Sequence, residues 1–140
     1  SLVVSFSRRY RNTSINYNFL RNFDNVYFIG LQAEYESFVK ENSLINVSYI
    51  PTSNALEAAE IINSSKCFIG NQSFFFSIAE GLKKTRALEV FEPIPNVLPV
   101  GENSFEYLFT SHLVNFLNKI FQKAYINTED RYPQYRLHLK

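Results

Sequence analysis

The stretch Lys66–Leu82, KCFIGNQSFFFSIAEGL, decides the fold that we expect for this chain. Its apolar start, Cys67–Ile69, predicts a buried strand, and the apolar residues from Phe75 to Leu82 recur at helical spacing. Between them lies Gly70–Ser73, a glycine followed by three polar residues. Because the first amides of a helix have no partner and favour an anion, the whole stretch predicts a phosphate site. The alternative is an ordinary capped turn between a strand and a helix.

Strands and helices alternate along the rest of the chain. The predicted strands are Leu2–Phe6, Val26–Gly30, Val47–Ile50 and Arg86–Phe91, with Asn96–Leu98 as a candidate edge strand. The predicted helices are Ile15–Phe23, Leu31–Asn42, one opened by Thr52-Ser53-Asn54, and Ser104–Tyr125. This order predicts an α/β fold, a Rossmann-like three-layer α/β/α sandwich with a mainly parallel sheet of five to six strands. We expect one domain over residues 1–125 and a C-terminal tail, 126–140, packed on it.

Composition narrows the class of protein. Hydrophobic residues make up 46% of the 140, which argues against disorder, and the net charge of +1 gives no electrostatic case for binding nucleic acid. No apolar run approaches the ~20 residues of a transmembrane segment, and no signal peptide is visible. The single cysteine favours a reducing compartment, so we expect a cytoplasmic protein. The chain begins without methionine, which fits either a removed initiator or a piece of a longer protein.

The candidate binding residues follow the predicted strands, because ligands of parallel sheets bind beyond the carboxyl ends of the strands. They are Ser7, Arg8, Arg9, Arg11, Gly30, Gly70, Asn71, Gln72, Ser73 and Glu89. The three arginines could clamp a diphosphate, since the guanidinium fork matches phosphate oxygens, or they could lie in a solvated loop. The carboxylate of Glu89 could accept hydrogen bonds from ribose or sugar hydroxyls, or it could be a surface group.

Several familiar signatures are absent from the sequence. It contains no Gly-x-Gly-x-x-Gly fingerprint, no Walker lysine loop and no Gly-x-Ser-x-Gly elbow. One cysteine and two histidines do not make a metal-ligand set. We therefore assign no catalytic residue, no metal and no cofactor from the sequence.

The residues FIGNQSFFFSIAEGLKK, followed by RALEVFEPIPNVLPVG, resemble the donor-binding half of GT-B glycosyltransferases. The most similar group is the ADP-heptose:lipopolysaccharide heptosyltransferase family with its uncharacterised bacterial and phage relatives. The resemblance runs through most of Leu2–Leu108 and is specific around Gly70–Leu82. It implies that Gly70, Asn71, Gln72 and Ser73 take the positions of the family's Gly-Asp-Thr/Ser-Gly turn, which holds the diphosphate of a nucleotide sugar.

The departures from that family affect the expected function. Asn71 replaces the aspartate of the turn, Ser73 replaces its second glycine, and Phe76 or Ser77 replaces a nearby histidine. These replacements are compatible with a different sugar donor and with a loss of catalysis. The resemblance also implies an N-terminal acceptor domain, for which 140 residues leave no room, so we expect the chain alone to be inactive. The alternatives are a non-catalytic module that binds a nucleotide, a phosphosugar or a protein, and a purely structural domain.

Overall fold

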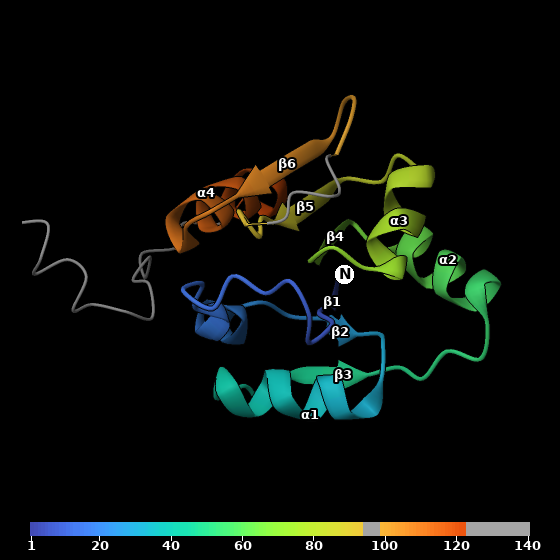
Figure 1. Cartoon of the computed structure of the whole chain (residues 1–140), viewed down its shortest axis with the longest axis horizontal. Helices are drawn as coiled ribbons and strands as arrows, with labels where there is room; N and C mark the ends of the chain where they lie inside the picture. Colours follow the sequence, from blue (N-terminus) through green and yellow to red (C-terminus); the bar gives the residue numbers. More distant parts are fainter. Residues whose placement is uncertain (94–98, 123–140) are drawn as a thin grey trace, which may run out of the picture.

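Six parallel strands form one sheet in the order β3-β2-β1-β4-β5-β6 (Figure 1). A computed structural model describes residues 1–93 and 99–122. Its strands are β1 (Leu2–Ser5), β2 (Val26–Phe28), β3 (Val47–Tyr49), β4 (Cys67–Gly70), β5 (Arg86–Glu89) and β6 (Ser104–Tyr107). Because all neighbours pair in parallel, the carboxyl ends of the strands share one edge. The strand order is that of the Rossmann fold.

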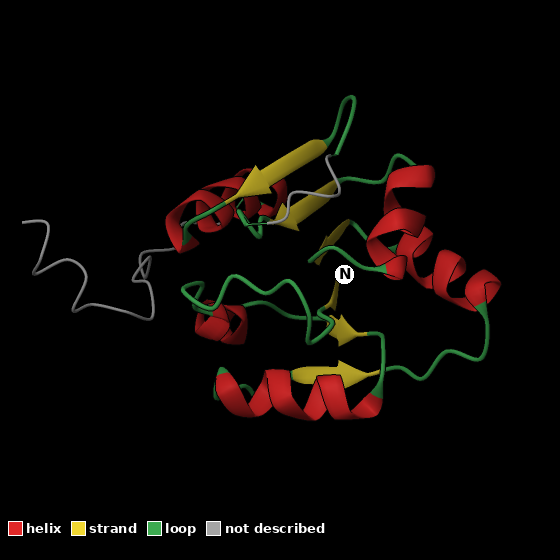
Figure 2. Ribbon diagram, in the orientation of Figure 1, coloured by secondary structure: helices red, strands yellow, loops and turns green. Residues whose placement is uncertain are grey.

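Helices cover both faces of this sheet, which makes three layers (Figure 2). The helices α2 (Ala55–Ser64) and α3 (Phe74–Gly81) pack on one face. The other face carries a 3-10 helix, η1 (Tyr17–Asn22), together with α1 (Gln32–Glu41) and α4 (Thr110–Phe121). The predicted α/β class, the three layers and the parallel sheet are therefore confirmed.

The apolar strands explain the layers, because alternate side chains of one strand point to opposite faces. Val3 and Phe68 pack under α2 and α3, whereas Leu2, Val4 and Ile69 pack with the helices of the other face. All residues of β1, β4 and β5 are buried. Such strands favour apolar residues on both faces, as in β1 and β4, whereas β5 also buries Arg86 and Glu89, which have hydrogen-bond partners.

Local capping explains where two of the helices begin. The hydroxyl of Ser73 accepts a hydrogen bond from the amide of Phe76, so Ser73 is the N-cap of α3. At the start of α2, the side chain of Asn54 accepts from the amide of Glu57 at 2.9 Å, and the Glu57 carboxylate accepts from the amide of Ser53 at 2.6 Å. The predicted helix starts at both positions are confirmed.

The predicted helix over Ser104–Tyr125 is wrong in its first part. Residues Ser104–Tyr107 form β6, which pairs with β5, and α4 begins only at Thr110. The sheet offers β6 a buried position for Tyr107, whereas Leu108 and Phe109, which would extend the helical stripe, are exposed. Phe105 also stacks on Phe116 of α4, with ring centroids 4.7 Å apart. Pairing and packing thus outweigh the local helical spacing of these residues.

Some predictions concern residues outside the described part. The candidate strand Asn96–Leu98 and the tail, 126–140, lie there, as does the end of the predicted domain beyond residue 122. Among residues 1–93 and 99–122, no helix is long and apolar enough to cross a membrane.

An ion pair between Arg86 and Glu80 lies at the amino-terminal end of β5. The guanidinium of Arg86, which is fully buried, donates through Nε to Glu80 Oε1 at 2.7 Å and through Nη2 to the Val100 carbonyl at 2.6 Å. Burial by itself raises the pKa of Glu80, but the hydrogen bonds from Arg86 and Lys83 lower it to about 2. The pair therefore holds α3, β5 and the segment before β6 together.

Candidate functional site

The candidate site lies where the order of the strands reverses, between β1 and β4. Ser5 of β1 pairs with Gly70 of β4. The strand that follows β1 lies on one side of this pair, and the strand that follows β4 lies on the other side. In open parallel sheets, ligands bind in the crevice at such a switch point. The basic loop, which we define as Ser7–Arg11, and the turn after β4 therefore meet at one place, although 64 residues separate Ser7 from Asn71.

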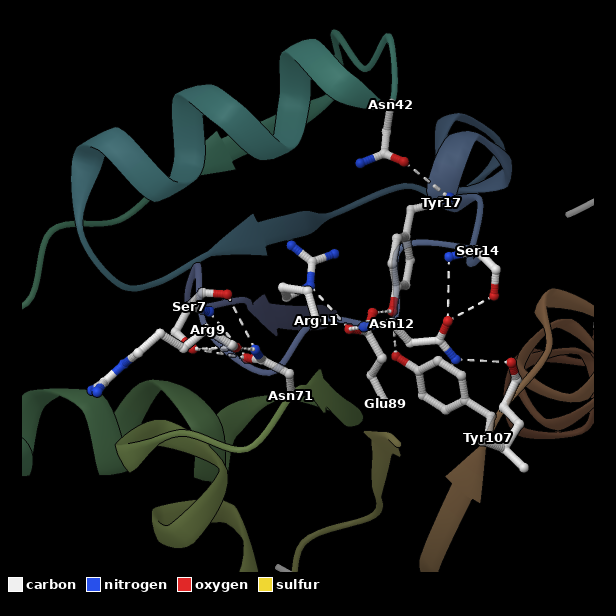
Figure 3. Close-up of polar contacts among 11 residues, drawn as sticks. Ser7, Arg9, Arg11, Asn12, Ser14, Tyr17, Asn42, Asn71, Glu89 and Tyr107 are labelled. Atoms are coloured by element: carbon white, nitrogen blue, oxygen red, sulfur yellow. Dashed lines mark hydrogen bonds and ion pairs between the residues drawn. The ribbon is translucent and has the colours of Figure 1, made fainter. Parts of the chain in front are cut away.

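The side chain of Asn71 ties the basic loop to the turn (Figure 3). Its Oδ1 accepts a hydrogen bond from the amide of Ser7 at 3.0 Å, and its Nδ2 donates to the carbonyls of Ser7 at 3.1 Å and Arg9 at 2.7 Å. Asn71 is fully buried. An aspartate here could accept the first bond but could not donate the other two, so the basic loop as built requires an amide.

The two predicted glycines have packing reasons that the sequence does not reveal. Gly70 is the last residue of β4, and a Cβ there would lie 2.8 Å from the carbonyl oxygen of Ser5. The close approach that requires a glycine is thus made by β1, within the protein itself. Gly30 has φ +138°, a conformation that side chains disfavour, and its carbonyl accepts from the hydroxyl of Tyr49 at 2.8 Å.

The beginning of α3 presents backbone donors beside the basic loop. The hydroxyl of Ser73 accepts from the amide of Phe76. The amides of Phe74 and Phe75, the first two of α3, come before that capped amide. The side chain of Phe74 is exposed, and Gln72 is 7% exposed. These two amides are the groups that a phosphate at this helix start would meet.

A buried carboxylate network lies on the other side of the basic loop. Oε1 of Glu89 accepts hydrogen bonds from Arg11 Nε at 2.9 Å and from the amide of Asn12 at 2.7 Å, and Oε2 accepts from the hydroxyl of Tyr17. Glu89 is fully buried, so the interpretation as a surface carboxylate is wrong. Contact with a ligand hydroxyl stays a prediction, and it would require one of these bonds to open.

Two buried tyrosines extend this network. The Tyr17 hydroxyl uses its only proton in the hydrogen bond that it donates to Glu89, so in its 2.6 Å contact with the hydroxyl of Tyr107 it is the acceptor. Burial, and then the negative charge of Glu89, raise the pKa of Tyr17 and of Tyr107 well above the usual value. Burial lowers the pKa of Arg11, but the neighbouring Glu89 outweighs this and leaves it raised. The network therefore holds one cation against one anion, with both phenols protonated.

The three arginines of the basic loop have different surroundings. Arg8 and Arg9 are exposed. The side chain of Arg11 is only 18% exposed, and its guanidinium carbon lies 4.6 Å from the centre of the Phe6 ring. Figure 3 shows Arg9 extending away from the Glu89 network, whereas Arg11 bridges towards it. The exposure of Arg8 and Arg9 fits a solvated loop and the burial of Arg11 does not, and a phosphate contact of any of the three stays a prediction.

Within residues 1–93 and 99–122, two clefts border the basic loop. The larger has a volume of about 390 Å³. One of its walls is formed by the basic loop and the residues that follow it, and the other by α1. Its lining includes Arg8, Arg11, Glu34, Ser37 and Glu41. The smaller, of about 220 Å³, lies beyond the carboxyl end of β5 and is lined by Arg11, Phe91 and Leu108 among others. Arg11 lines both clefts, which makes it the charged group between them.

The ten predicted residues lie in four different places in the structure. The switch point brings together Ser7, Arg9, Gly70, Asn71, Gln72 and Ser73, the Glu89 network holds Arg11, and Arg8 lines the larger cleft. Gly30 lies two residues after β2, where its carbonyl accepts from Tyr49, and not with the others. Sequence reasoning missed Asn12, Tyr17 and Tyr107. Only the position of Tyr107 at the end of a strand could have pointed to it, and the sequence pattern there predicts a helix.

Comparisons with known proteins add no relative to this picture. No family model, curated protein or solved structure matched the chain. Among residues 1–93 and 99–122, no three histidine, cysteine or acidic side chains gather as a metal site would require. The description of the candidate site therefore rests on its geometry.

Proposed function

We propose that this domain is the nucleotide-sugar-binding half of a glycosyltransferase-like protein, similar to the heptosyltransferases, and works in the cytoplasm. The donor diphosphate lies at the switch point, against the helix start after Gly70–Ser73. The observation that supports this most is the meeting of two elements there, because Asn71, in the turn before α3, bonds to the backbone of the basic loop, whose Arg8 and Arg9 are exposed. Both are chemically suited to phosphate, and Asn71 fixes one against the other.

The proposed chemistry is transfer of the sugar from its nucleotide diphosphate to an acceptor hydroxyl. Negative charge grows on the departing diphosphate as the bond to the sugar breaks. Arg9 and the amides of Phe74 and Phe75 are donors that stabilise that charge, and Asn71 keeps the backbone of Arg9 in place. The acceptor and the catalytic base belong to an N-terminal domain in this proposal.

A non-catalytic module that binds a nucleotide or a phosphosugar is the second candidate. The state of Glu89 favours it, since the one carboxylate that the sequence predicted for the site is fully buried and bonded to Arg11, Asn12 and Tyr17. Such a carboxylate holds the scaffold and offers no base to a substrate. In this candidate the phosphate contacts are the same and turnover is absent.

Replacing Phe74 by proline tests the amide contact that both candidates share. Phe74 is the first residue of α3, where proline is tolerated, and Ser73 before it has the extended backbone (φ −158°, ψ 169°) that precedes proline well. Phe74→Pro therefore removes one amide donor and leaves the helix intact. Phe74→Ala is the matched control, because it removes the same ring and keeps the amide.

Calorimetric titration of the purified chain with ADP, UDP, GDP and their sugars gives the measurement. We expect saturable binding of at least one nucleotide, with Phe74→Pro weaker than Phe74→Ala by about ten-fold or more, the scale of a hydrogen bond to a charged group. Arg9→Ala should weaken binding to a similar extent. The proposal fails if no nucleotide binds, or if the proline and alanine variants bind equally well.

A further inference from the structure

The guanidinium of Arg11 lines the larger cleft, and its hydrogen bond to the buried Glu89 fixes its position. Arg11 bonds to Glu89 through Nε alone, and within the described residues its hydrogen bonds involve neither Nη atom. The guanidinium carbon also lies 4.6 Å from the centre of the Phe6 ring, so both a buried carboxylate and an aromatic ring restrict its movement. Figure 3 shows the two Nη atoms on the side away from Glu89, facing the region between the basic loop and α1.

Two Nη atoms of one guanidinium form the fork that binds a carboxylate or phosphate through two oxygens. Because Glu89 holds the Nε end, the fork is presented to the cleft without the entropy loss that an unrestrained arginine would suffer. Arg8 lines the same cleft and is exposed, so a second cation lies within the same lining. Glu89 balances the charge of Arg11, so Arg8 is the residue that adds positive charge to this wall, which suits an anionic group.

The opposite wall has a different chemistry. Helix α1 contributes Glu34, Ser37 and Glu41 to the lining, which are hydrogen-bond acceptors and one hydroxyl. Glu34 is held in place, because its Oε2 accepts from the amide of Leu31 at 3.1 Å. Carboxylates repel a small inorganic anion but accept hydrogen bonds from sugar hydroxyls. A ligand that fits both walls has a phosphate at one end and hydroxyl groups at the other.

We propose that this cleft is a second binding site, for a phosphate monoester of a polyhydroxylated small molecule such as a sugar phosphate. Arg11 is its phosphate contact, Ser37 and Glu34 contact its hydroxyls, and Glu89 is a positioning residue that acts through Arg11. The volume of about 390 Å³ is in the range of small-ligand pockets, roughly 300–1,000 Å³. None of residues 70–73 lines the cleft, so this site is separate from the helix start proposed for the diphosphate.

Calorimetry with glucose 6-phosphate, inorganic phosphate and glucose tests the site on the purified chain. We expect glucose 6-phosphate to bind more tightly than phosphate, and glucose not to bind. Arg11→Lys keeps the charge but loses the fork, so it should weaken glucose 6-phosphate by about ten-fold or more. Arg21→Lys, at an exposed arginine outside the lining, should leave the affinity unchanged.

Two further variants separate the roles of the two walls. Ser37→Ala should weaken glucose 6-phosphate several-fold and leave inorganic phosphate unchanged. Glu89→Gln should release Arg11, which ¹⁵N NMR of the arginine side chains would detect as faster exchange of its Nε–H proton, together with weaker binding. A variant that loses only stability would leave the Nε–H signal as in the parent protein.

The outcomes discriminate clearly. The proposal is overturned if glucose 6-phosphate shows no saturable binding, if Arg11→Lys behaves as Arg21→Lys does, or if inorganic phosphate binds as tightly as glucose 6-phosphate. Phe74→Pro should not alter glucose 6-phosphate binding, whereas it should weaken nucleoside diphosphates. A failure of one site therefore does not imply failure of the other.

Discussion

Replacing Glu80 by glutamine should remove a large part of the acid sensitivity of this fold. In the folded chain the hydrogen bonds from Arg86 and Lys83 outweigh burial and lower the pKa of Glu80 from 4.5 to about 2. A tenfold change in an acid dissociation constant corresponds to about 1.4 kcal/mol, which gives an upper bound of roughly 3.5 kcal/mol for the stabilisation at pH 7. The Glu80 side chain is 21% exposed, so screening by solvent reduces this figure. Because glutamine still accepts the bond from Arg86 Nε but has no charge, we expect Glu80→Gln to be less stable by about 1–2 kcal/mol at pH 7.

The sign of the pH dependence follows from the lowered pKa. The stabilisation is fully present above about pH 4.5, the pKa of the unfolded state, and is lost as the pH falls towards about 2. The difference between parent and variant should therefore shrink across this range and vanish at its acid end. Urea unfolding monitored by tyrosine fluorescence, at pH 7, pH 4 and pH 2.5, measures this difference; the chain has nine tyrosines and no tryptophan.

A matched control is Glu60→Gln, because Glu60 is exposed on α2 and takes part in none of the three ion pairs of the described residues. It should change stability by less than about 0.5 kcal/mol at every pH. Our reasoning would be refuted if Glu80→Gln and the parent protein lost stability in parallel between pH 7 and pH 2.5. The ion pair with Arg86 would then contribute nothing that depends on the charge of Glu80.

Three further predictions concern the centre of the sheet. Asn71→Asp should lower the free energy of unfolding by about 2–4 kcal/mol in urea titrations, because two donors to backbone carbonyls are lost and a carboxylate faces those oxygens. Gly70→Ala should lower the melting temperature, since its methyl would lie 2.8 Å from the carbonyl of Ser5, whereas Gly81→Ala meets no atom within 4 Å and should be neutral or stabilising. Burial raises the pKa of the Cys67 thiol to about 12, so a thiol reagent at pH 8 should label it only in urea.

Each of these has a clear contrary outcome. An Asn71→Asp variant as stable as the parent would show that the basic loop does not need the amide donors. Equal melting temperatures for Gly70→Ala and Gly81→Ala would contradict the close contact between β1 and β4. Rapid labelling of Cys67 in the folded chain would mean that β4 is more open than its complete burial indicates.

The sequence by itself determined the class of fold. Apolar runs such as Leu2–Phe6 and Cys67–Ile69 can only be buried on both faces, and the amphipathic segments between them supply the covering helices. Alternation of the two then implies parallel strands with a common carboxyl edge, so the candidate binding segments could be placed at that edge. The cap of α3 at Ser73 was also readable, because it depends on residues three positions apart.

Only the tertiary structure decided which of those segments meet. The order β3-β2-β1-β4-β5-β6 puts the basic loop beside Asn71, and no local pattern encodes that neighbourhood. The edge strand β6 was missed for the same reason, since its stability comes from pairing with β5 and from packing on α4. A short segment with mixed periodicity adopts the structure that its neighbours favour.

The roles of the charged residues depended most on tertiary structure. In the sequence, Arg8, Arg9 and Arg11 are equivalent, and Glu89 is an acidic residue at a strand end. In the fold, Glu89 is buried against Arg11 and Tyr17, so that one arginine is fixed while the other two stay exposed. The physical reason is that the buried charge of Glu89 needs hydrogen-bond partners. Arg11 and Tyr17 supply them, and they precede Glu89 in the chain by 78 and 72 positions.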